Sequence, residues 1–244
     1  MHRFYCPAKN ITAEVITLSD QGHIHHIKNV LRLKAESELV IFDEQKNEYL
    51  CCIEKIQPQK IVLKVKTKIL STVTSQLKIS VACAIPKKSK MDDIVDKLTQ
   101  LGVERIIPLE TERGIVKIER QKRSTRIERW KKIALSACLQ SQRRDVPVIE
   151  PIKNMEEVLL DSGNYDLKLL PTLEGKRRPL KEIMSQTKPQ NILVFIGPEG
   201  DFSQRELELA KKSGCIPVTL GDTVLRVETA CLAVVSFIKL YAEG

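Results

Sequence analysis

Two glycine-containing turns near the C-terminal end of the chain are the segments best suited to bind a small ligand. The turn 197–200, with the sequence GPEG, directly follows the apolar run 192–196, and the turn 221–222, with the sequence GD, follows the run 216–220. Proline fixes one φ angle, and glycine permits conformations and close approaches that a side chain forbids. Neither turn has a neighbouring Lys, so both suit a ligand that is held by backbone groups.

Motifs that would indicate other common ligands are missing from the sequence. No segment matches the phosphate-binding pattern GxxxxGK[ST], and no GxGxxG follows the first strand expected in the second half of the chain. His23, His25 and His26 lie close together, but no Cys or carboxylate completes a spacing that zinc sites use. We therefore expect neither a nucleotide-hydrolysis site nor a bound metal ion.

The elements around the first turn place it where a ligand would bind. The run 192–196 is apolar throughout and rich in β-branched residues, which predicts a strand buried on both faces, as in a parallel sheet flanked by helices. Ser203 and Glu206 have the spacing of a capping box at the start of the next helix. Ligands of open α/β sheets bind at the carboxyl ends of the strands, which is the position of this turn.

The middle of the chain alternates strands and helices, which is typical of an α/β domain. Met91, Ile94 and Leu98 share one face of the first helix, which Gly102 is expected to end. Strands are predicted at 77–85, 105–109, 166–172 and 216–220, and helices at 87–101, 119–142 and from about 224 to 241.

Residues 1 to about 70 alternate short apolar runs with polar turns, a spacing that predicts a small β-barrel with strands near 15–16, 39–42, 49–53 and 61–65. The segment 25–32 predicts a short helix in which Ile27, Val30 and Leu31 face inward and Lys28 and Arg32 face outward. Serine and threonine become frequent over 67–76, which indicates a linker. We therefore predict two domains, 1–72 and 73–244.

The charge of the chain favours a polyanionic partner. The 244 residues include 40 Lys and Arg against 31 Asp and Glu, a formal net charge of +9, although solubility alone is an alternative reason for such a charge. The predicted helix 119–142 is either a solvated surface or one that contacts phosphate groups. Its basic residues are Arg120, Lys122, Arg123, Arg126, Arg129, Lys131 and Lys132.

The cysteines and the hydropathy pattern bear on the cellular compartment. The seven cysteines form no CxxC pair and lie mostly among apolar neighbours, which predicts reduced thiols in the core. No apolar run approaches the roughly 18 residues of a membrane span, and the segment 1–7 lacks the core of a signal peptide. We therefore expect a cytoplasmic protein.

Several longer motifs resemble one known family. The segment 196–203 reads IGPEGDFS, and the segment 220–230 reads LGDTVLRVETA. Two more motifs are KLTQLGV at 97–103 and QSQR at 140–143, and the N-terminal run at 25–32 reads HHIKNVLR. Together they closely resemble the RsmE family of ribosomal RNA methyltransferases, which belongs to the SPOUT superfamily. The resemblance spans nearly the whole chain.

The resemblance implies a fold and an activity. The fold is α/β, with an N-terminal PUA-like, RNA-binding β-barrel and a C-terminal SPOUT domain that contains a trefoil knot. The activity is methylation of N3 of a uridine in 16S rRNA of the small ribosomal subunit, with S-adenosyl-L-methionine as the methyl donor. SPOUT enzymes usually complete each site across a dimer, so the resemblance also implies a homodimer.

The resemblance also implies roles for individual residues. Arg226 and Arg143 are the expected catalytic residues, because a guanidinium can stabilise a uridinate but cannot act as a base. Glu199 and Glu228 are candidate proton acceptors, with a turn-capping or helix-start role as the alternative, so the base is left unassigned. The expected cofactor-binding residues are Leu170, Thr172, Ile196, Gly197, Pro198, Glu199, Gly200, Leu220, Gly221, Val224, Leu225, Arg226 and Thr229. The expected RNA-binding residues are Arg32, Arg113, Arg123, Arg126, Gln140, Arg143 and Arg144.

Three positions depart from the family pattern. Asp201 stands where glycine is usual, Val227 replaces a threonine, and Leu139 replaces a common glutamate. Asp201 places a negative charge beside the proposed cofactor loop. Two other functions stay open from the sequence: a non-catalytic RNA-binding or ribosome-assembly protein, and a SPOUT methyltransferase that acts on tRNA.

Overall fold

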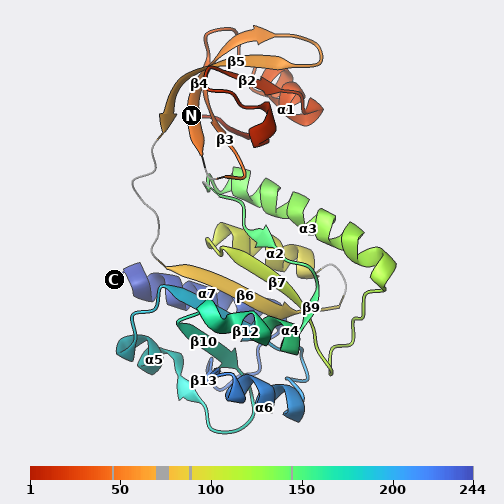
Figure 1. The fold of residues 1–244 in the computed structure, drawn as a ribbon, viewed down its shortest axis with the longest axis vertical. Helices are drawn as coiled ribbons and strands as arrows, with labels where there is room; N and C mark the ends of the chain where they lie inside the picture. The colour runs from red at the N-terminus through yellow and green to blue at the C-terminus, as the bar shows by residue number, and fades with distance from the viewer. Residues whose placement is uncertain (46, 70–76, 88–89, 144, 244) are drawn as a thin grey trace. The chain divides into compact units, whose positions relative to one another are not determined.

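The computed structural model describes residues 1–45, 47–69, 77–87, 90–143 and 145–243 (Figure 1). The chain forms two compact units, each with its own core. The first unit comprises Met1–Thr74 and Cys138–Val146, and the second comprises Ser75–Ala137 and Pro147–Gly244.

A curled five-stranded sheet builds the first unit. Its strand order is β1 (Arg3–Tyr5), β3 (Glu38–Phe42), β4 (Glu48–Ile56), β5 (Ile61–Ile69) and β2 (Val15–Leu18). The β1–β3 pair is parallel, and the other pairs are antiparallel. The four strands predicted from the sequence are confirmed. The short strand β1 was not predicted, because three residues are too few for a periodic pattern.

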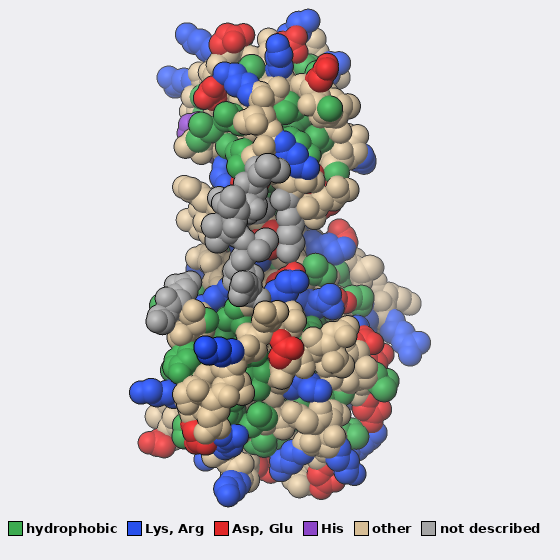
Figure 2. Space-filling view, turned by 60° about the vertical axis from the view of Figure 1, so that its left-hand side comes forward, with side chains coloured by type: hydrophobic (Ala, Val, Ile, Leu, Met, Phe, Trp, Pro, Cys, Tyr) green, Lys and Arg blue, Asp and Glu red, His purple; other side chains and the backbone are tan. Residues whose placement is uncertain are grey.

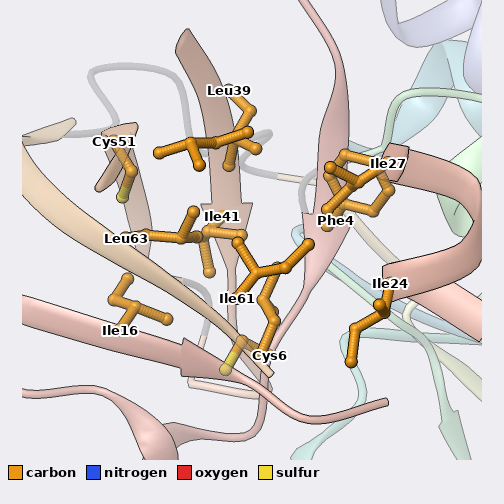
Figure 3. Close-up of a cluster of buried hydrophobic side chains, with 12 residues drawn as sticks. Phe4, Cys6, Ile16, Ile24, Ile27, Leu39, Ile41, Cys51, Ile61 and Leu63 are labelled. Carbon is orange, nitrogen blue, oxygen red and sulfur yellow. The ribbon is translucent and has the colours of Figure 1, made fainter. Parts of the chain in front are cut away.

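The core of this unit is made by alternate residues of the strands and by one short helix (Figure 3). Phe4 from β1 lies beside Ile27 and near Ile24. The strands contribute Leu39 and Ile41 from β3, together with Cys51, Ile61, Leu63 and Ile16 from the other strands.

The predicted helix at 25–32 starts earlier and changes its geometry. Asp20 caps α1 (Gln21–His25), which continues directly into the π-helical turn η2 (His26–Val30). Ile27 is buried as predicted, but the prediction for Val30 is wrong, because 57% of this residue is exposed. The wider turn, in which the Leu31 N–H donates to the His26 carbonyl, rotates Val30 away from the core.

The predicted linker begins later than the rise in serine and threonine suggested. Strand β5 extends to Ile69, so residues 67–69 are paired with β4 and are not linker. Residues 70–76, which include the predicted domain boundary at 72–73, lie outside the described residues. The boundary therefore stays a prediction.

A parallel sheet forms the centre of the second unit. Its strand order is β11 (Arg178–Pro179), β13 (Ile216–Thr219), β10 (Leu167–Pro171), β12 (Asn191–Ile196), β6 (Lys78–Ala84), β7 (Arg105–Glu110) and β8 (Val148–Ile149), and β9 (Lys153–Asn154) pairs with β7. The strand predicted at 192–196 lies between β10 and β6 and is buried, as expected for an inner strand of a parallel sheet.

Helices cover both faces of this sheet (Figure 1). On one face, α7 (Val227–Glu243) contacts α2 (Lys90–Gln100), β6 and β12. On the other, α4 (Met155–Leu160) and α6 (Gln204–Lys212) form a core cluster with Ala82, Leu193 and Phe195. The alternation along β6 explains the two layers, because Ala82 joins this cluster while the next residue, Cys83, contacts Met91 of α2.

The remaining helices of the structure differ in part from the predicted ones. The helix predicted from Lys87 begins at Lys90, and Lys87 itself lies in a bend. The basic helix α3 spans Arg120–Gln140, and α5 spans Leu180–Gln186. The short helices α4 and α5 were not predicted from the sequence. Two single 3-10 turns occur at Ala8–Asn10 and Ser162–Asn164.

All seven cysteines are buried free thiols. This confirms the prediction that they belong to the core. Burial raises the pKa of Cys6 and Cys138 to about 11 and that of Cys51 and Cys215 to about 12. Within the described residues, no helix is long and apolar enough to cross a membrane.

Candidate functional site

The loops that follow β10, β12 and β13 together enclose one pocket in the second unit. Because β10 lies between the other two strands, the loop after β10 lies between the two glycine turns and forms the pocket wall that connects them. The empty space in and at the mouth of the pocket, with open solvent included, is about 540 Å³. Its lining residues are Pro171, Thr172, Leu173, Arg177, Ile196, Gly197, Pro198, Glu199, Asp201, Leu220, Gly221, Thr223, Val224, Leu225, Val227 and Ala230.

The first glycine turn is shaped by the residues behind it. A Cβ atom on Gly197 would lie 3.1 Å from the ring of Phe202, which is fully buried, so a side chain at this position would displace the core. The Asp201 N–H donates to the Pro198 carbonyl at 2.9 Å and closes the turn. Asp201 has a φ of 58°, in the left-handed region that favours glycine.

The second turn is held by its own strand. Gly221 has a φ of 118°, which a residue with a side chain rarely adopts, and its N–H donates to Oγ1 of Thr219 at 3.2 Å. The chain then runs through 223–225 along the pocket before α7 begins at Val227.

Nine of the expected cofactor-binding residues line this pocket, and four do not. Leu170 is fully buried in the core, and Gly200, Arg226 and Thr229 lie beside the pocket without lining it. The nine are Thr172, Ile196, Gly197, Pro198, Glu199, Leu220, Gly221, Val224 and Leu225. The sequence pattern therefore brings most of its members to one place, and the binding role of each stays a prediction.

Sequence reasoning missed several pocket residues. The family resemblance implies that the loop after β10 helps to enclose the cofactor, and this loop does line the pocket, but its residues Leu173 and Arg177 were not among the expected cofactor-binding residues. Val227 and Ala230 are three positions apart at the start of α7, so helical periodicity could have identified them. Asp201 and Val227 were noticed only as departures from the family pattern. Pro171 and Thr223 complete the set.

Arg226 immediately precedes α7, between Leu225 and Val227, which both line the pocket. The Ala230 N–H donates to the Arg226 carbonyl at 2.8 Å, which fixes the backbone at this position. Arg226 is exposed. No ion pair of its guanidinium is found among the described residues, which leaves this group available to a ligand or an RNA base.

Glu228 has a different environment from that of a general base. Its carboxylate forms an ion pair and a hydrogen bond with Lys90 of α2. Partial burial alone would raise the pKa of Glu228, but the hydrogen bond from Lys90 and the charges of Lys90 and Arg226 outweigh it, so the pKa is lowered. A carboxylate with a lowered pKa is a weak proton acceptor near neutral pH.

Arg143 belongs to the first unit and is largely buried there. Its guanidinium Nε and Nη2 atoms donate to the two carboxylate oxygens of Asp145, each at 3.2 Å, and 11% of its side chain is exposed. Its backbone carbonyl accepts a hydrogen bond from Arg3. The guanidinium is thus fixed by a partner of its own unit, and the catalytic role expected for Arg143 stays a prediction.

The residues expected to bind RNA differ in their exposure and in whether their side chains already have partners in the protein. Arg113 contacts the Gly200 carbonyl at 3.0 Å, and Arg123 pairs with Glu110 at 2.6 Å. Arg32, Arg126 and Gln140 are exposed, whereas Arg144 lies outside the described residues. On the face drawn in Figure 2, basic and acidic side chains are interspersed.

Several basic residues of α3 are already paired with acidic side chains. Arg129 donates twice to Asp92. Lys122 pairs with Glu119, which directly precedes the helix, and Lys131 pairs with Glu128 of the helix itself. Within the described part of the chain, Arg120, Arg126 and Lys132 show no ion pair. The positive charge that α3 offers to a phosphate backbone is therefore smaller than its composition suggests.

The chemistry of the pocket fits a ligand with a positive centre and an apolar, flat part. Glu199 and Asp201 line it with negative charge, Arg177 is the single basic residue in the lining, and no Lys is present there. Leu220, Leu225 and Ile196 provide apolar surface. Two carboxylates would oppose a phosphate group. Among the described residues, no group of three or more His, Cys, Asp or Glu side chains could hold a metal ion.

Comparison with known proteins defines the class to which this fold and site belong. The RNA methyltransferase domain family matches residues 73–239, and the RNA methyltransferase PUA domain family matches residues 18–66. The second unit is thus an RNA methyltransferase domain, and the first contains a PUA domain.

Comparison with individual proteins identifies a narrower family within this class. The chain is 30% identical to ribosomal RNA small subunit methyltransferase E of Rickettsia conorii, with 98% of this chain and 95% of the relative covered. Its fold is similar to that of ribosomal RNA small subunit methyltransferase E from Neisseria gonorrhoeae, whose crystal structure is bound to S-adenosyl methionine. The TM-score is 0.85 at 29% sequence identity, and the match covers 98% of this chain and 97% of the Neisseria chain. A putative methyltransferase from Legionella pneumophila, in complex with the same cofactor, gives a TM-score of 0.84 at 28% identity, with 98% and 96% covered. The chain belongs to the family of ribosomal RNA small subunit methyltransferase E, the RsmE family of the SPOUT superfamily.

Proposed function

We propose that this enzyme transfers a methyl group from S-adenosyl-L-methionine to N3 of a uridine in 16S rRNA. The observation that carries the proposal is the pocket at the ends of β10, β12 and β13, in which nine of the residues expected from the family motifs come together. The cofactor named for the Neisseria and Legionella structures supports the same assignment.

The lining of the pocket supports this cofactor, because each part of the molecule would find a suitable partner there. The apolar side chains of Ile196, Leu220 and Leu225 would hold the adenine ring, and the backbone groups of the two glycine turns would supply its hydrogen-bond partners. The carboxylate of Glu199 would favour a cationic sulfonium over a neutral sulfide. This electrostatic preference distinguishes the methyl donor from its demethylated product.

The protein contributes positioning and charge to the reaction. The cofactor, when bound, supplies an electrophilic methyl group, whose transfer leaves the bonding electron pair on sulfur. N3 of uridine must lose its proton before it can attack, and Arg226 would stabilise the negative charge that then develops on the uracil oxygens. Because Glu228 is paired with Lys90, Glu199 in the pocket lining is the remaining candidate for the proton acceptor.

The proposal includes the setting of the reaction. The net charge of +9 and the PUA domain would bind the RNA, and a target base that is already unstacked would cost least to present. We infer a homodimer, because SPOUT enzymes usually complete their sites across two subunits, and a cytoplasmic location, where ribosomal RNA is found. The trefoil knot of the superfamily is part of the same proposal.

The deciding experiment is mass mapping of 16S rRNA and tRNA from cells that lack the gene, with a complemented strain as control. We expect one uridine of 16S rRNA to lose the mass of a methyl group and to regain it on complementation. Loss of a methyl group from tRNA alone would establish the tRNA alternative. Unchanged RNA, together with no heat of binding in calorimetric titration with S-adenosyl-L-methionine, would establish a non-catalytic RNA-binding protein.

A further inference from the structure

Asp201 joins two walls of the cofactor pocket. Its Oδ2 atom accepts a hydrogen bond from the Thr172 hydroxyl and another from the Leu173 N–H, each at 2.7 Å. Its Oδ1 atom accepts from the Phe202 N–H at 2.8 Å. Thr172 and Leu173 belong to the loop after β10, whereas Asp201 ends the turn after β12. The carboxylate is therefore a direct bond between loops that are about thirty residues apart in sequence.

This contact is buried and charged, which makes it strong. Only 6% of Asp201 and 7% of Thr172 are exposed. Hydrogen bonds to an ionised acceptor are shorter and stronger than neutral ones, and they are poorly screened when they are buried. The Thr172 hydroxyl accepts in turn from the Glu174 N–H at 3.2 Å, and the Thr172 carbonyl accepts from Arg177 at 3.2 Å. The network thus reaches along the loop to a further pocket residue, Arg177.

A second, outer link joins the same two segments. Nη1 of Arg113 donates to the Gly200 carbonyl at 3.0 Å and lies 3.6 Å from the Glu174 carboxylate. The Arg113 and Glu174 side chains are 45% and 48% exposed, so salt and water weaken this link. Of the two links, the buried Asp201 carboxylate should hold the loop.

The backbone conformation of Asp201 indicates that the side chain is retained for its contacts. A φ of 58° disfavours residues with a side chain, and Asp is among those that tolerate it best. Glycine would fit this backbone without strain but would remove all three hydrogen bonds. Asp201 therefore combines a less favourable backbone conformation with hydrogen bonds that connect the two loops.

We propose that Asp201 is a positioning residue that holds the loop 172–177 against the turn 197–201 and so keeps the cofactor pocket in its binding-competent form. The inference rests on the proposed function, because it concerns binding of S-adenosyl-L-methionine. Asp201 acts on affinity through the population of the competent pocket, since the apparent dissociation constant rises as that population falls.

The test compares D201G, D201N and wild type as full-length protein, by calorimetric titration with S-adenosyl-L-methionine and by hydrogen exchange at the Leu173 amide. Glycine suits the backbone at this position, so D201G is expected to fold. Loss of hydrogen bonds to a charged group changes an equilibrium by roughly tenfold, and we expect D201G to raise the cofactor Kd by about that factor and to speed exchange at Leu173. D201N keeps one acceptor oxygen and should lose less affinity than D201G.

The control is E174Q, which removes the exposed ion pair on the same loop and should change the Kd by less than about twofold. A D201G protein with wild-type cofactor affinity would overturn the inference. So would weakened affinity with unchanged exchange at Leu173, or equal losses in D201N and D201G. Failure of the wild-type chain to bind the cofactor would instead count against the proposed function, so the two failures are distinguishable.

Discussion

Arg226 and Glu228 lie two positions apart at the start of α7, yet their surroundings suit them to different tasks. Arg226 is exposed beside the pocket, whereas Glu228 is tied to Lys90 of α2. The ion pair fixes the first turn of α7 to a neighbouring helix, and so it fixes the backbone from which Arg226 projects. An exposed guanidinium on a rigid backbone is a suitable group for stabilising an anionic base.

Replacement of Arg226 should separate catalysis from cofactor binding. We expect Arg226→Ala to lower kcat for methyl transfer by at least about a hundredfold, since loss of one donor to a developing oxyanion typically costs that much. The cofactor Kd should change by only a few fold, because Arg226 does not line the pocket. Single-turnover kinetics with radiolabelled cofactor and calorimetry measure the two effects.

Arg226→Lys provides the matched variant. It keeps the charge but loses the planar fork, so its rate should fall between wild type and Arg226→Ala. Turnover of Arg226→Ala at the wild-type rate would remove this residue from the mechanism. A kcat that is preserved alongside a greatly raised cofactor Kd would assign Arg226 to binding instead.

At the scale of elements, the helix after the first glycine turn shows how local sequence fixes the position of a site. Ser203 and Glu206 form the predicted capping box of α6. Oε2 of Glu206 accepts from the Ser203 N–H at 2.8 Å, and Oε1 accepts from the Glu112 N–H at 3.0 Å. The cap therefore also attaches α6 to the segment that follows β7, in which Arg113 donates to the Gly200 carbonyl of the glycine turn.

Removal of the cap should destabilise the second unit measurably. We expect Ser203→Ala to lower the free energy of unfolding by about 1 kcal/mol, because the Glu206 N–H loses its acceptor. Gln204→Ala, at the exposed neighbouring position, should change it by less than about 0.5 kcal/mol. Denaturant unfolding followed by circular dichroism measures both. Equal stability of the two variants would show that the box contributes nothing.

The elements that sequence alone predicted are those with a strong pattern. The buried strand at 192–196, the capping box of α6 and the apolar face of α2 each have several residues in a fixed period. Val30 was misplaced because a π-helical turn breaks the period of 3.6 on which the prediction relied. The short helices α4 and α5 and the two-residue strands have too few residues for any period to show.

The candidate site was predictable only in part for a related reason. The glycine turns carry a motif, but Leu173 and Arg177 enter the pocket because β10 lies between β12 and β13 in the sheet. Strand order is a property of the whole domain, which no local spacing encodes. The contacts of Asp201 likewise depend on a loop that lies far away in sequence.

At the scale of the whole molecule, the net charge of +9 predicts how RNA binding responds to salt. Each phosphate contact should contribute about 0.7 to the slope of log K against log salt for single-stranded RNA, because binding releases a condensed counterion. Arg126 is exposed and without an ion pair in the described part of the chain, so Arg126→Ala should reduce the slope by about that amount. Filter binding or fluorescence anisotropy over a range of salt concentrations measures it.

Arg126→Lys keeps the charge and should leave the slope unchanged, which makes it the control for this position. A wild-type affinity that does not vary with salt would contradict phosphate contacts altogether. A slope that is the same in Arg126→Ala and wild type would place the contacts on other basic residues.

The burial of every native thiol makes this protein a convenient subject for spectroscopic work. A maleimide dye reacts with thiolates, and all seven thiols of the chain are buried. Burial also raises the pKa of Cys51 and Cys215 to about 12, so these two are hard to ionise. A single cysteine introduced at an exposed position such as Leu160, which is 85% exposed, would therefore be labelled alone. Fluorophores could then be attached at chosen points without first removing any of the seven native cysteines.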